Sequence, residues 1–315
     1  MVNIKKAAII GCGFVGSSIA FALMQKGQFN ELVLIDQNKD KAEGEAMDLA
    51  HGLPYTFSVD IHAGDYEEIK DASVIIITAG AAQKPGQTRL DLIQTNAHIT
   101  KSIVRELKRV EVEGILLLVA NPVDILTHIA YQESGFSKNR VFGSGTVLDT
   151  ARLKYLLSKH LTVDAKNVHA VIIGEHGDSE TAIWSGANIS GVPLNDFCAL
   201  RGYTDHDGGM KRIQDDVVNS AYRIIEKKGA TYYGIALSVS HIVSCIVNNT
   251  HTMLPVSVEL EGTYGLKNLA LSIPSLVGRD GVEKVLELPL TEQERNKLKA
   301  SASSLLEVIS QINND

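Results

Sequence analysis

Cysteine is scarce in this sequence, and its arrangement excludes two kinds of protein. Three cysteines occur among 315 residues, Cys12, Cys198 and Cys245. None lies in a Cys-x-x-Cys pair or at the Cys/His spacing of a metal site. An odd number of widely separated thiols also argues against a disulfide-stapled secreted domain. The composition therefore predicts a cytoplasmic protein without a metal site.

Linkers, repeats and large charge blocks are also missing. No internal repeat, low-complexity tract or Pro/Gly-rich linker is present, so any two domains are joined by short ordered connections. The uncharged run from Ala7 to Met24 contains Gly11, Gly13 and Gly16, which argue against a membrane helix. The formal net charge of −7 predicts a surface that repels nucleic acid and anionic lipid, and we expect neither as a partner. A local pair of arginines can still bind a small anionic substrate.

Short segments rich in Ile, Val and Leu alternate with helical patterns in the first half of the chain. Such segments are typical of strands buried on both faces, and their alternation with helices predicts an α/β fold with a doubly wound parallel sheet. The second half has longer helices and then antiparallel-type alternation over residues 253–288, which predicts a mixed α+β substrate domain. The expected strands are 7–10, 32–35, 58–61, 74–78, 115–119 and 168–173, and the expected helices are 15–25, 41–51, 90–109, 148–159, 209–227, 232–248 and a last one capped by Thr291 and Glu294.

A dinucleotide-binding pattern follows the first predicted strand. Residues 11–16 read G-C-G-F-V-G, in which Gly11 makes a tight turn, Gly13 lets the backbone approach a pyrophosphate and Gly16 lets the helix pack on the sheet. A second strand ends at Asp36, twenty residues after Gly16. Asp36 would accept hydrogen bonds from ribose hydroxyls and repel a 2′-phosphate, which favours NAD over NADP. The alternative is three turn glycines and a surface aspartate.

A second group of residues suits proton transfer to a carbonyl. Residues 174–178 read G-E-H-G-D directly after a predicted strand, and a histidine on such a loop has a pKa close to neutrality. Asp149 and Arg152 share one helical face, so Asp149 could orient His176 while Arg152 grips a carboxylate with a bidentate fork. They could instead form a plain intrahelical ion pair. We expect structural roles for eight other histidines: His51, His62, His98, His128, His160, His206, His241 and His251.

Five motifs occur in order along the chain: G-C-G-F-V-G, T-A-G-A-A-Q-K-P-G-Q-T-R, V-A-N-P-V-D, G-S-G-T-V-L-D-T-A-R and G-E-H-G-D. Together they resemble the lactate/malate dehydrogenase family, and in particular its bacterial L-lactate dehydrogenases, over nearly the whole chain. The resemblance implies a Rossmann NAD-binding domain at residues 1–144 and a catalytic domain at 145–315. It also implies hydride transfer between NADH and pyruvate to give L-lactate and NAD, the final step of anaerobic glycolysis.

The resemblance assigns roles to individual residues. His176 would donate and accept the proton with Asp149 as its partner, and Arg152 would anchor the carboxylate. Residues 81–89 would form a lid that brings Arg89 to the carbonyl, and the alternative is an ordinary surface loop. The implied substrate contacts are Gln83, Arg89, Asn121, Asp124, Asp149, Arg152 and Thr231. The cofactor contacts that we expect are Gly11, Gly13, Phe14, Val15, Gly16, Asp36, Lys41, Tyr66, Thr78, Ala79, Gly80, Ala81, Ser102, Val119, Asn121 and Ser144.

Within this family, Gln83 matches the position that separates lactate from malate dehydrogenases. Malate dehydrogenases carry an arginine there, which pairs with a second carboxylate. A dicarboxylate held against the neutral Gln83 would bury an unpaired charge at a cost of roughly several kcal/mol, so we expect pyruvate as the substrate. The neighbouring Lys84 keeps malate or a broader 2-keto acid range open.

A regulatory site is also implied by the resemblance. Some bacterial members are tetramers that fructose 1,6-bisphosphate activates at a subunit interface, where an arginine and a histidine contact phosphate. The matching positions are Lys154 and His169. Lysine keeps the charge but loses the bidentate fork, which predicts weakened phosphate binding. The alternative is that both are plain interface or surface residues.

Two readings from other classes stay open. NAD-requiring glycosidases have a related nucleotide-binding architecture, but they need a metal-binding cysteine and histidine beside the nicotinamide, and no cysteine lies near His176 in this sequence. A catalytically silent NAD-binding module is the other alternative. The combination of Asp149, Arg152 and His176 favours an enzyme over both.

Overall fold

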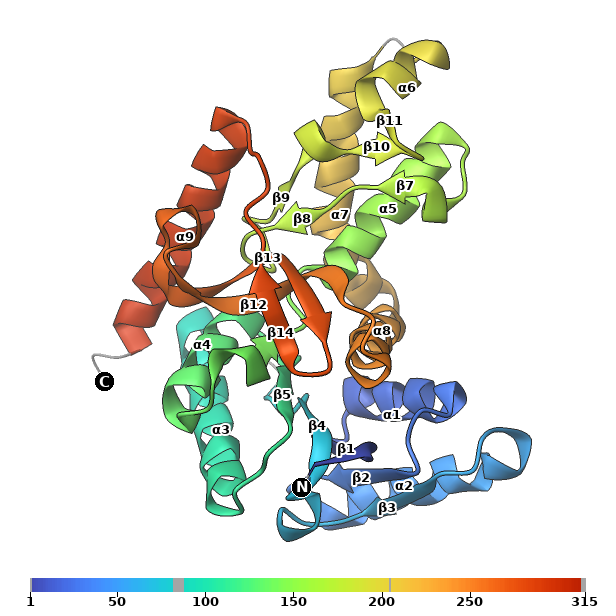
Figure 1. Ribbon diagram of the computed structural model, residues 1–315, viewed down its shortest axis with the longest axis vertical. Coiled ribbons are helices and arrows are strands. Elements are labelled where there is room, and N and C mark those ends of the chain that lie inside the picture. The colour runs from blue at the N-terminus through green and yellow to red at the C-terminus, as the bar shows by residue number, and fades with distance from the viewer. Residues whose placement is uncertain (1, 82–87, 204, 313–315) are drawn as a thin grey trace.

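The buried apolar segments of the first half lie side by side as parallel strands (Figure 1). The structure is a computed structural model that describes residues 2–81, 88–203 and 205–312. Within them β1 pairs with β2 and β4, and the sheet continues to β3 on one side and through β5 to β6 on the other. The order 3-2-1-4-5-6 is that of a doubly wound Rossmann sheet, which reverses between β1 and β4. These strands are β1 (Asn3–Ile10), β2 (Glu31–Ile35), β3 (Asp60–Ala63), β4 (Ala72–Ile77), β5 (Ile115–Leu118) and β6 (Val141–Gly143).

Helices cover both faces of this sheet because its strands are apolar on both sides. Ile75 and Ile76 of β4 are fully buried, yet they belong to separate cores, since successive side chains of a strand point to opposite faces. Ile76 packs in the core that includes Ile19 of α1, and Ile75 packs in the core that includes Leu107 of α3. The helices that accompany the first five strands are α1 (Phe14–Lys26), α2 (Lys39–His51), α3 (Arg89–Arg109) and α4 (Val123–Ser134).

The second half of the chain extends the same sheet with antiparallel strands. Ser257 of β12 (Thr252–Glu261) pairs with Gly143 of β6, and β13 (Lys267–Gly278) and β14 (Gly281–Val285) follow at the outer edge. Residues 168–173 are not the single strand that the apolar run predicts. They form β7 (Val168–His169) and β8 (Ile172–Ile173), which pair in different small sheets with β10 (Asn188–Ile189), β11 (Val192–Pro193) and β9 (Thr181–Ala182).

Four helices of the second half confirm the helical patterns of the sequence: α5 (Val147–Leu161), α7 (His206–Lys228), α8 (Tyr233–Asn248) and α9 (Glu292–Ile312). The short helix α6 (Leu194–Leu200) is not among the predicted helices. The backbone amide of Glu294 donates to Thr291 Oγ1 at 3.3 Å, and the backbone amide of Thr291 donates to Glu294 Oε2 at 2.9 Å. This is the reciprocal capping that the sequence predicts for the last helix.

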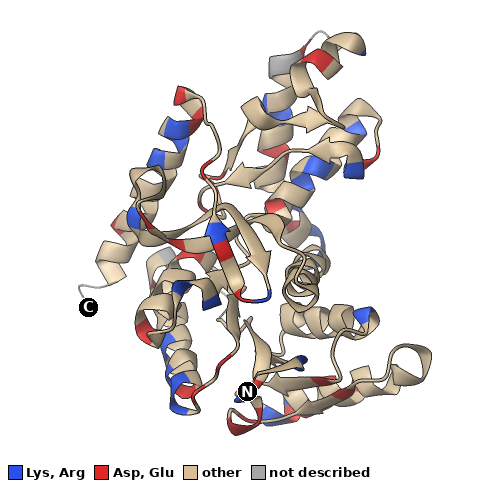
Figure 2. Cartoon of the chain, viewed as in Figure 1, with Lys and Arg blue, Asp and Glu red and all other residues tan. Residues whose placement is uncertain are grey.

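Both acidic and basic residues occur along α3 and α9 (Figure 2), and in α9 all of them are exposed except Glu294. Across residues 2–81, 88–203 and 205–312, no helix combines the length and the apolar character needed to cross a membrane. The fold is therefore an α/β Rossmann sheet followed by a mixed α+β domain, as predicted.

Candidate active site

The glycine-rich turn connects β1 to α1 at the carboxyl edge of the parallel sheet. Gly11 has a φ of +104°, and a Cβ there would lie 2.5 Å from the backbone nitrogen of Ala79. A Cβ on Gly16 would lie 1.9 Å from the carbonyl oxygen of Gly11. A Cβ on Gly13 would meet no described protein atom within 4 Å, so the space beside Gly13 is open to a ligand. The first and third glycines are thus required by packing, and the second borders a free surface.

The start of α1 has the features of a phosphate site. Gly13 is the N-cap residue, and no side chain of the described residues caps the first amides of the helix. Asp36 follows β2, and its Oδ2 accepts a hydrogen bond from the Cys12 amide at 2.7 Å. This bond fixes the Asp36 carboxylate beside the turn, where it can meet a ribose next to a phosphate.

A cavity of about 550 Å³ lies at this edge. Ten predicted cofactor residues line it: Gly11, Gly13, Asp36, Lys41, Tyr66, Thr78, Ala79, Gly80, Ala81 and Ser102. Six others, namely Phe14, Val15, Gly16, Val119, Asn121 and Ser144, are not among its lining residues. The ten lining residues fit a dinucleotide, since the cavity joins the start of α1 to the carboxylate of Asp36, a group that suits a ribose.

His98 also lines this cavity, although the sequence pattern predicts a structural role for it. It shares a face of α3 with Ser102, one helical turn further on, and Ile99 and Ile103 line the same cavity. The i,i+4 spacing from the predicted Ser102 is the signal that could have identified His98.

His176 is held by the start of α4. Its backbone amide donates to Asp124 Oδ2 at 2.7 Å, and Asp124 Oδ1 accepts a hydrogen bond from Ser257 Oγ at 2.6 Å. Asp124 is 2% exposed and lies behind the loop of His176. Because α4 follows β5, these bonds attach the loop of His176 to the same carboxyl edge that carries the cavity.

Asp149 joins His176 to Arg152. Its Oδ2 lies 2.6 Å from Nδ1 of His176, and its Oδ1 accepts a hydrogen bond from Nη1 of Arg152 at 2.8 Å. The side chains of Asp149, Arg152 and His176 are 2%, 13% and 23% exposed. The intrahelical ion pair and the histidine contact therefore coexist, and Nε2 of His176 makes no hydrogen bond to a described residue.

Electrostatics favour a protonated His176. Burial lowers its pKa, but the charge of Asp149 and the hydrogen bond to it raise the pKa to about 9. Burial acts in the opposite sense on Asp149, yet His176 and Arg152 keep the pKa of that carboxyl below its ordinary value. Burial raises the pKa of Asp124 to about 6. These interactions favour the protonated form of His176 at neutral pH.

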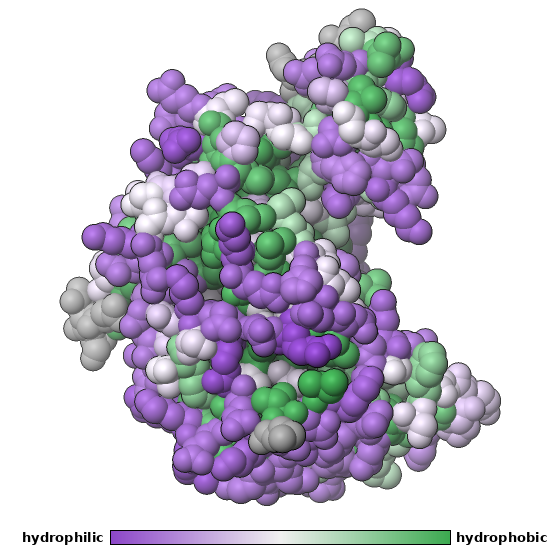
Figure 3. All heavy atoms as spheres, viewed as in Figure 1, coloured by the Kyte–Doolittle hydropathy of each residue, from purple (hydrophilic) through white to green (hydrophobic). Residues whose placement is uncertain are grey.

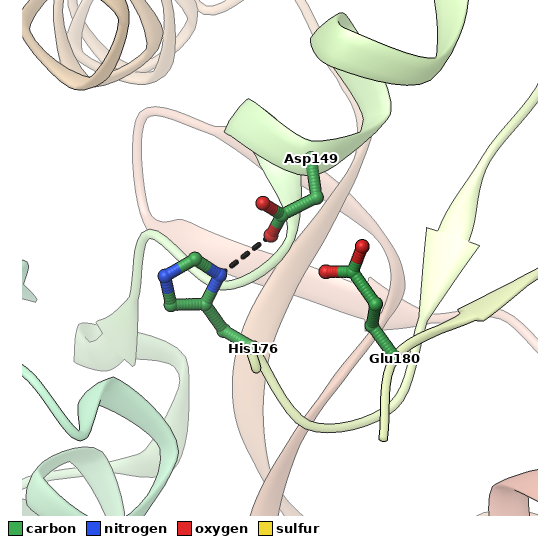
Figure 4. Close-up of side chains that lie close together, drawn as sticks. All are labelled: Asp149, His176 and Glu180. Carbon is green, nitrogen blue, oxygen red and sulfur yellow. Dashed lines mark hydrogen bonds and ion pairs between the residues drawn. The ribbon is translucent and has the colours of Figure 1, made fainter. Parts of the chain in front are cut away.

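Glu180 is the site residue that the sequence pattern does not reveal. Its carboxyl group lies with Asp149 and His176 in one cluster whose ligand-type atoms are within 4.8 Å of one another (Figure 4). It is 6% exposed. The signal available in the sequence is weak, since Glu180 comes only four residues after His176 and looks like a surface residue of the loop.

The remaining predicted residues lie at the ends of helices. Asn121 is exposed, and its Oδ1 accepts a hydrogen bond from the Val123 amide at 3.3 Å. Thr231 is half-buried before α8. Arg89 is the first residue of α3, and its side chain lies outside the described part, as does the whole of Gln83. The geometry therefore brings together His176, Asp149 and Arg152, while residues 82–87 of the predicted lid lie outside the described part of the chain.

Lys154 and His169 line a different cavity, of about 740 Å³. Burial lowers the pKa of Lys154, and His169 is exposed. Most of the other lining residues are apolar, among them Leu237 and Met253, which are 64% and 50% exposed.

Comparison with known proteins gives one consistent result. Residues 5–143 match the family profile of the lactate/malate dehydrogenase NAD binding domain, and residues 146–315 match that of the alpha/beta C-terminal domain of the same enzymes. The chain is 51% identical over 308 residues to L-lactate dehydrogenase of Thermoanaerobacterium saccharolyticum, covering 98% of this chain and 99% of that protein. It is 52% identical to L-lactate dehydrogenase 1 of Clostridium acetobutylicum, with 98% of each covered.

Solved structures agree with the sequence matches. The minor L-lactate dehydrogenase from Enterococcus mundtii in its ligands-bound form superposes with a TM-score of 0.95 at 45% identity, covering 98% of each chain. A lactate dehydrogenase from a Medee basin deep-sea metagenome library superposes with a TM-score of 0.96 at 42% identity, covering 99% of this chain and 100% of that one.

Proposed function

The chain belongs to the lactate/malate dehydrogenase family and is an NAD-dependent oxidoreductase, and from this premise we propose that it interconverts pyruvate and L-lactate. The observation that carries the proposal is the hydrogen-bonded series Arg152–Asp149–His176 at the carboxyl edge of the sheet. The relatives named above support the choice of substrate. The same resemblance supports a place as the final step of anaerobic glycolysis.

His176 is the proton donor for the carbonyl oxygen. The Nδ1 contact with Asp149 leaves Nε2 to face the substrate, and the raised pKa keeps the ring protonated at neutral pH. Bound NADH supplies the hydride, so that one proton and one hydride reduce the ketone to a hydroxyl group. In the reverse direction His176 accepts the hydroxyl proton, and Asp149 stabilises the resulting cation.

Arg152 binds the substrate carboxylate. The contact with Asp149 engages Nη1, and the guanidinium has five N–H donors in a planar fork. Its side chain is 13% exposed, so the ion pair with the substrate forms in a partly dehydrated site, where charge interactions are strong. By family resemblance Arg89 polarises the carbonyl, and Asn121 and Thr231 line the pocket.

The residues that line the 550 Å³ cavity would hold NAD, and the amides at the start of α1 would bind its pyrophosphate. Asp36 accepts hydrogen bonds from the adenosine ribose, and its charge opposes the 2′-phosphate of NADP. We place the boundary between the NAD-binding and catalytic domains between residues 144 and 145, supported by the family profiles, of which one ends at residue 143 and the other begins at residue 146.

Pyruvate is preferred over oxaloacetate because Gln83 offers no charge to a second carboxylate. An unpaired buried carboxylate costs roughly several kcal/mol, enough for a selectivity of about two or more orders of magnitude. Malate dehydrogenase activity is the second candidate, and it is favoured only by the lysine next to Gln83.

We also propose a cytoplasmic homotetramer with a fructose 1,6-bisphosphate site at Lys154 and His169. Free buried cysteines at all three positions support a reducing compartment. The exposed apolar side chains around the 740 Å³ cavity support burial against another subunit. Figure 3 shows apolar residues gathered in the middle of the viewed face, and Tyr233, Leu237 and Met253 are among those exposed in the molecule.

The direct test is a comparison of wild type with His176→Gln. Wild-type enzyme should oxidise NADH with pyruvate and form L-lactate. The variant should lose most turnover, by roughly a hundredfold or more, because it lacks the acid, yet it should still bind NADH in a fluorescence titration. Near-normal turnover in the variant would remove His176 from the mechanism.

A further inference from the structure

The backbone of Glu180 is held in place at the end of the loop that carries His176. Its backbone amide donates to the carbonyl oxygen of Gly177 at 3.2 Å, and its carbonyl oxygen accepts a hydrogen bond from Nε2 of Gln214 at 3.3 Å. Gln214 belongs to α7 and accepts a hydrogen bond from the indole of Trp184 at 3.3 Å. These bonds hold the backbone of Glu180 on both sides, and its side chain extends into the interior, where the residue is 6% exposed.

The carboxyl group of Glu180 points towards Asp149 (Figure 4). Both oxygens of Asp149 already have cationic partners, Oδ1 with Arg152 and Oδ2 with His176. Glu180 Oε1 is buried and has no hydrogen-bond partner among the described residues. An ionised carboxylate in this position would be a second buried anion beside Asp149 without a cation of its own.

We propose that Glu180 is a positioning residue that stays in its neutral acid form, donates a hydrogen bond to the Asp149 carboxylate and so keeps the site able to take up a substrate carboxylate. Carboxyl oxygens of Glu180 and Asp149 lie within 4.8 Å of each other and both residues are buried, so the two groups are expected to hold one proton between them, because a like charge and desolvation both oppose the second ionisation. Burial is the main cause that raises the pKa of Glu180, and the charge of Asp149 raises it further, to about 9, against the opposing charges of His176 and Arg152.

The neutral state matters for anion binding. The charged neighbours of Glu180 are Asp149 and Arg152 on α5 and His176 on the same loop as Glu180. Asp124 on α4 acts on His176, and Gln214 on α7 is uncharged. In the proposed function a substrate carboxylate binds to Arg152, close to this cluster of charged side chains. An ionised Glu180 would oppose its entry, whereas the acid form presents a donor to Asp149 and leaves the positive charge of Arg152 and His176 for the substrate. This step rests on the proposed function.

Infrared spectroscopy tests the protonation state directly. Wild-type protein at neutral pH should show the carbonyl-stretch band of a buried protonated carboxylic acid, and Glu180→Gln should lose that band. The control is Glu294→Gln, which removes another buried carboxyl group. Hydrogen bonds lower the pKa of Glu294 although burial raises it, so the infrared band should persist in this variant. If Glu180→Gln does not fold, the band in wild-type protein labelled with ¹³C-glutamate should shift. Absence of the band, or a band unmoved by the label and by Glu180→Gln, overturns the proposal.

Steady-state kinetics test whether the neutral state of Glu180 aids the binding of pyruvate. At neutral pH, Glu180→Gln should keep the KM for pyruvate within about threefold of wild type, since a neutral group replaces a neutral group. Above about pH 8 the KM should rise less steeply with pH in the variant than in wild type. Deprotonation of His176 and of Glu180 both weaken anion binding, and the variant lacks the second of these. A KM that falls about tenfold at neutral pH would mean that Glu180 is ionised in wild type. The infrared band with no pyruvate activity would refute the proposed function and leave the protonation intact.

Discussion

Replacement of Asp149 by asparagine isolates the charge that maintains a protonated His176. The asparagine keeps the size of the side chain and an oxygen that can accept a hydrogen bond, but it removes the carboxylate that lies 2.6 Å from Nδ1 of His176. Burial of the ring remains and continues to favour the neutral imidazole. We therefore expect the pKa of His176 to fall from about 9 to its ordinary value of 6.5 or below.

The size of the effect follows from this difference. A shift from 6.5 to about 9 corresponds to about 3 kcal/mol at about 1.36 kcal/mol per unit. At about pH 7.5 nearly all wild-type molecules would carry the proton, whereas about one in ten would do so in Asp149→Asn. The KM for pyruvate should then rise about tenfold or more at this pH, and acidification to about pH 5.5 should restore most of the loss.

The assay is the KM for pyruvate from about pH 5 to about pH 9, with NADH saturating. Asp216→Asn is the matched control, because it removes a surface carboxylate that lies 2.7 Å from Nη1 of Arg223 and should leave the profile unchanged. If Asp149→Asn kept the wild-type pH profile, or if acid brought no recovery, the charge of Asp149 would not set the protonation of His176.

Four other changes have defined outcomes. Arg152→Lys should raise the KM for pyruvate by about one to two orders of magnitude, with a smaller change in kcat, since a point charge replaces a fork; equal losses in both would contradict this. Gly11→Ala should abolish NADH binding or folding because its Cβ would meet Ala79 at 2.5 Å, as an NADH titration and thermal unfolding would show. Gln83→Arg should move the preference towards oxaloacetate by about tenfold or more in kcat/KM. Saturating fructose 1,6-bisphosphate should lower the half-saturation concentration of pyruvate, and Lys154→Ala should remove the effect; an unchanged value in wild type would refute the effector site.

The same ion pair makes stability depend on pH. The folded-state pKa of His176 lies above its unfolded value, so the contribution of the pair is fully present below about pH 6.5 and is lost as the pH rises through about 9. The fall in the free energy of unfolding between these values should be smaller in Asp149→Asn than in wild type, as urea titrations at several pH values would measure. Equal pH dependence in both proteins would show that the pair adds no stability.

The sequence predicts the parallel sheet well because burial on both faces leaves a simple pattern. Segments such as residues 74–77 are apolar at every position, and the spacing of Gly11, Gly13 and Asp36 follows from local turn and helix geometry. The single strand predicted at 168–173 is wrong, because an apolar run does not show that the chain changes sheets after His169.

The site is less predictable where it depends on tertiary contacts. The i,i+3 spacing places Asp149 and Arg152 on one helical face, but only the fold brings His176 to Asp149 from another element. For Glu180 the sequence offers only its closeness to His176, because its burial depends on how the loop packs in the fold. The roles of the individual site residues stay predictions until variants are measured.

The most direct test of the account compares pyruvate and oxaloacetate as substrates for NADH oxidation, side by side and at matched concentrations. The neutral Gln83 and the proposed binding of one carboxylate by Arg152 predict a kcat/KM for pyruvate at least about a hundredfold above that for oxaloacetate. A preference for oxaloacetate would leave the fold and the hydride chemistry in place but contradict the substrate. No turnover with either substrate would contradict the proposed role of His176, Asp149 and Arg152 as a lactate dehydrogenase site.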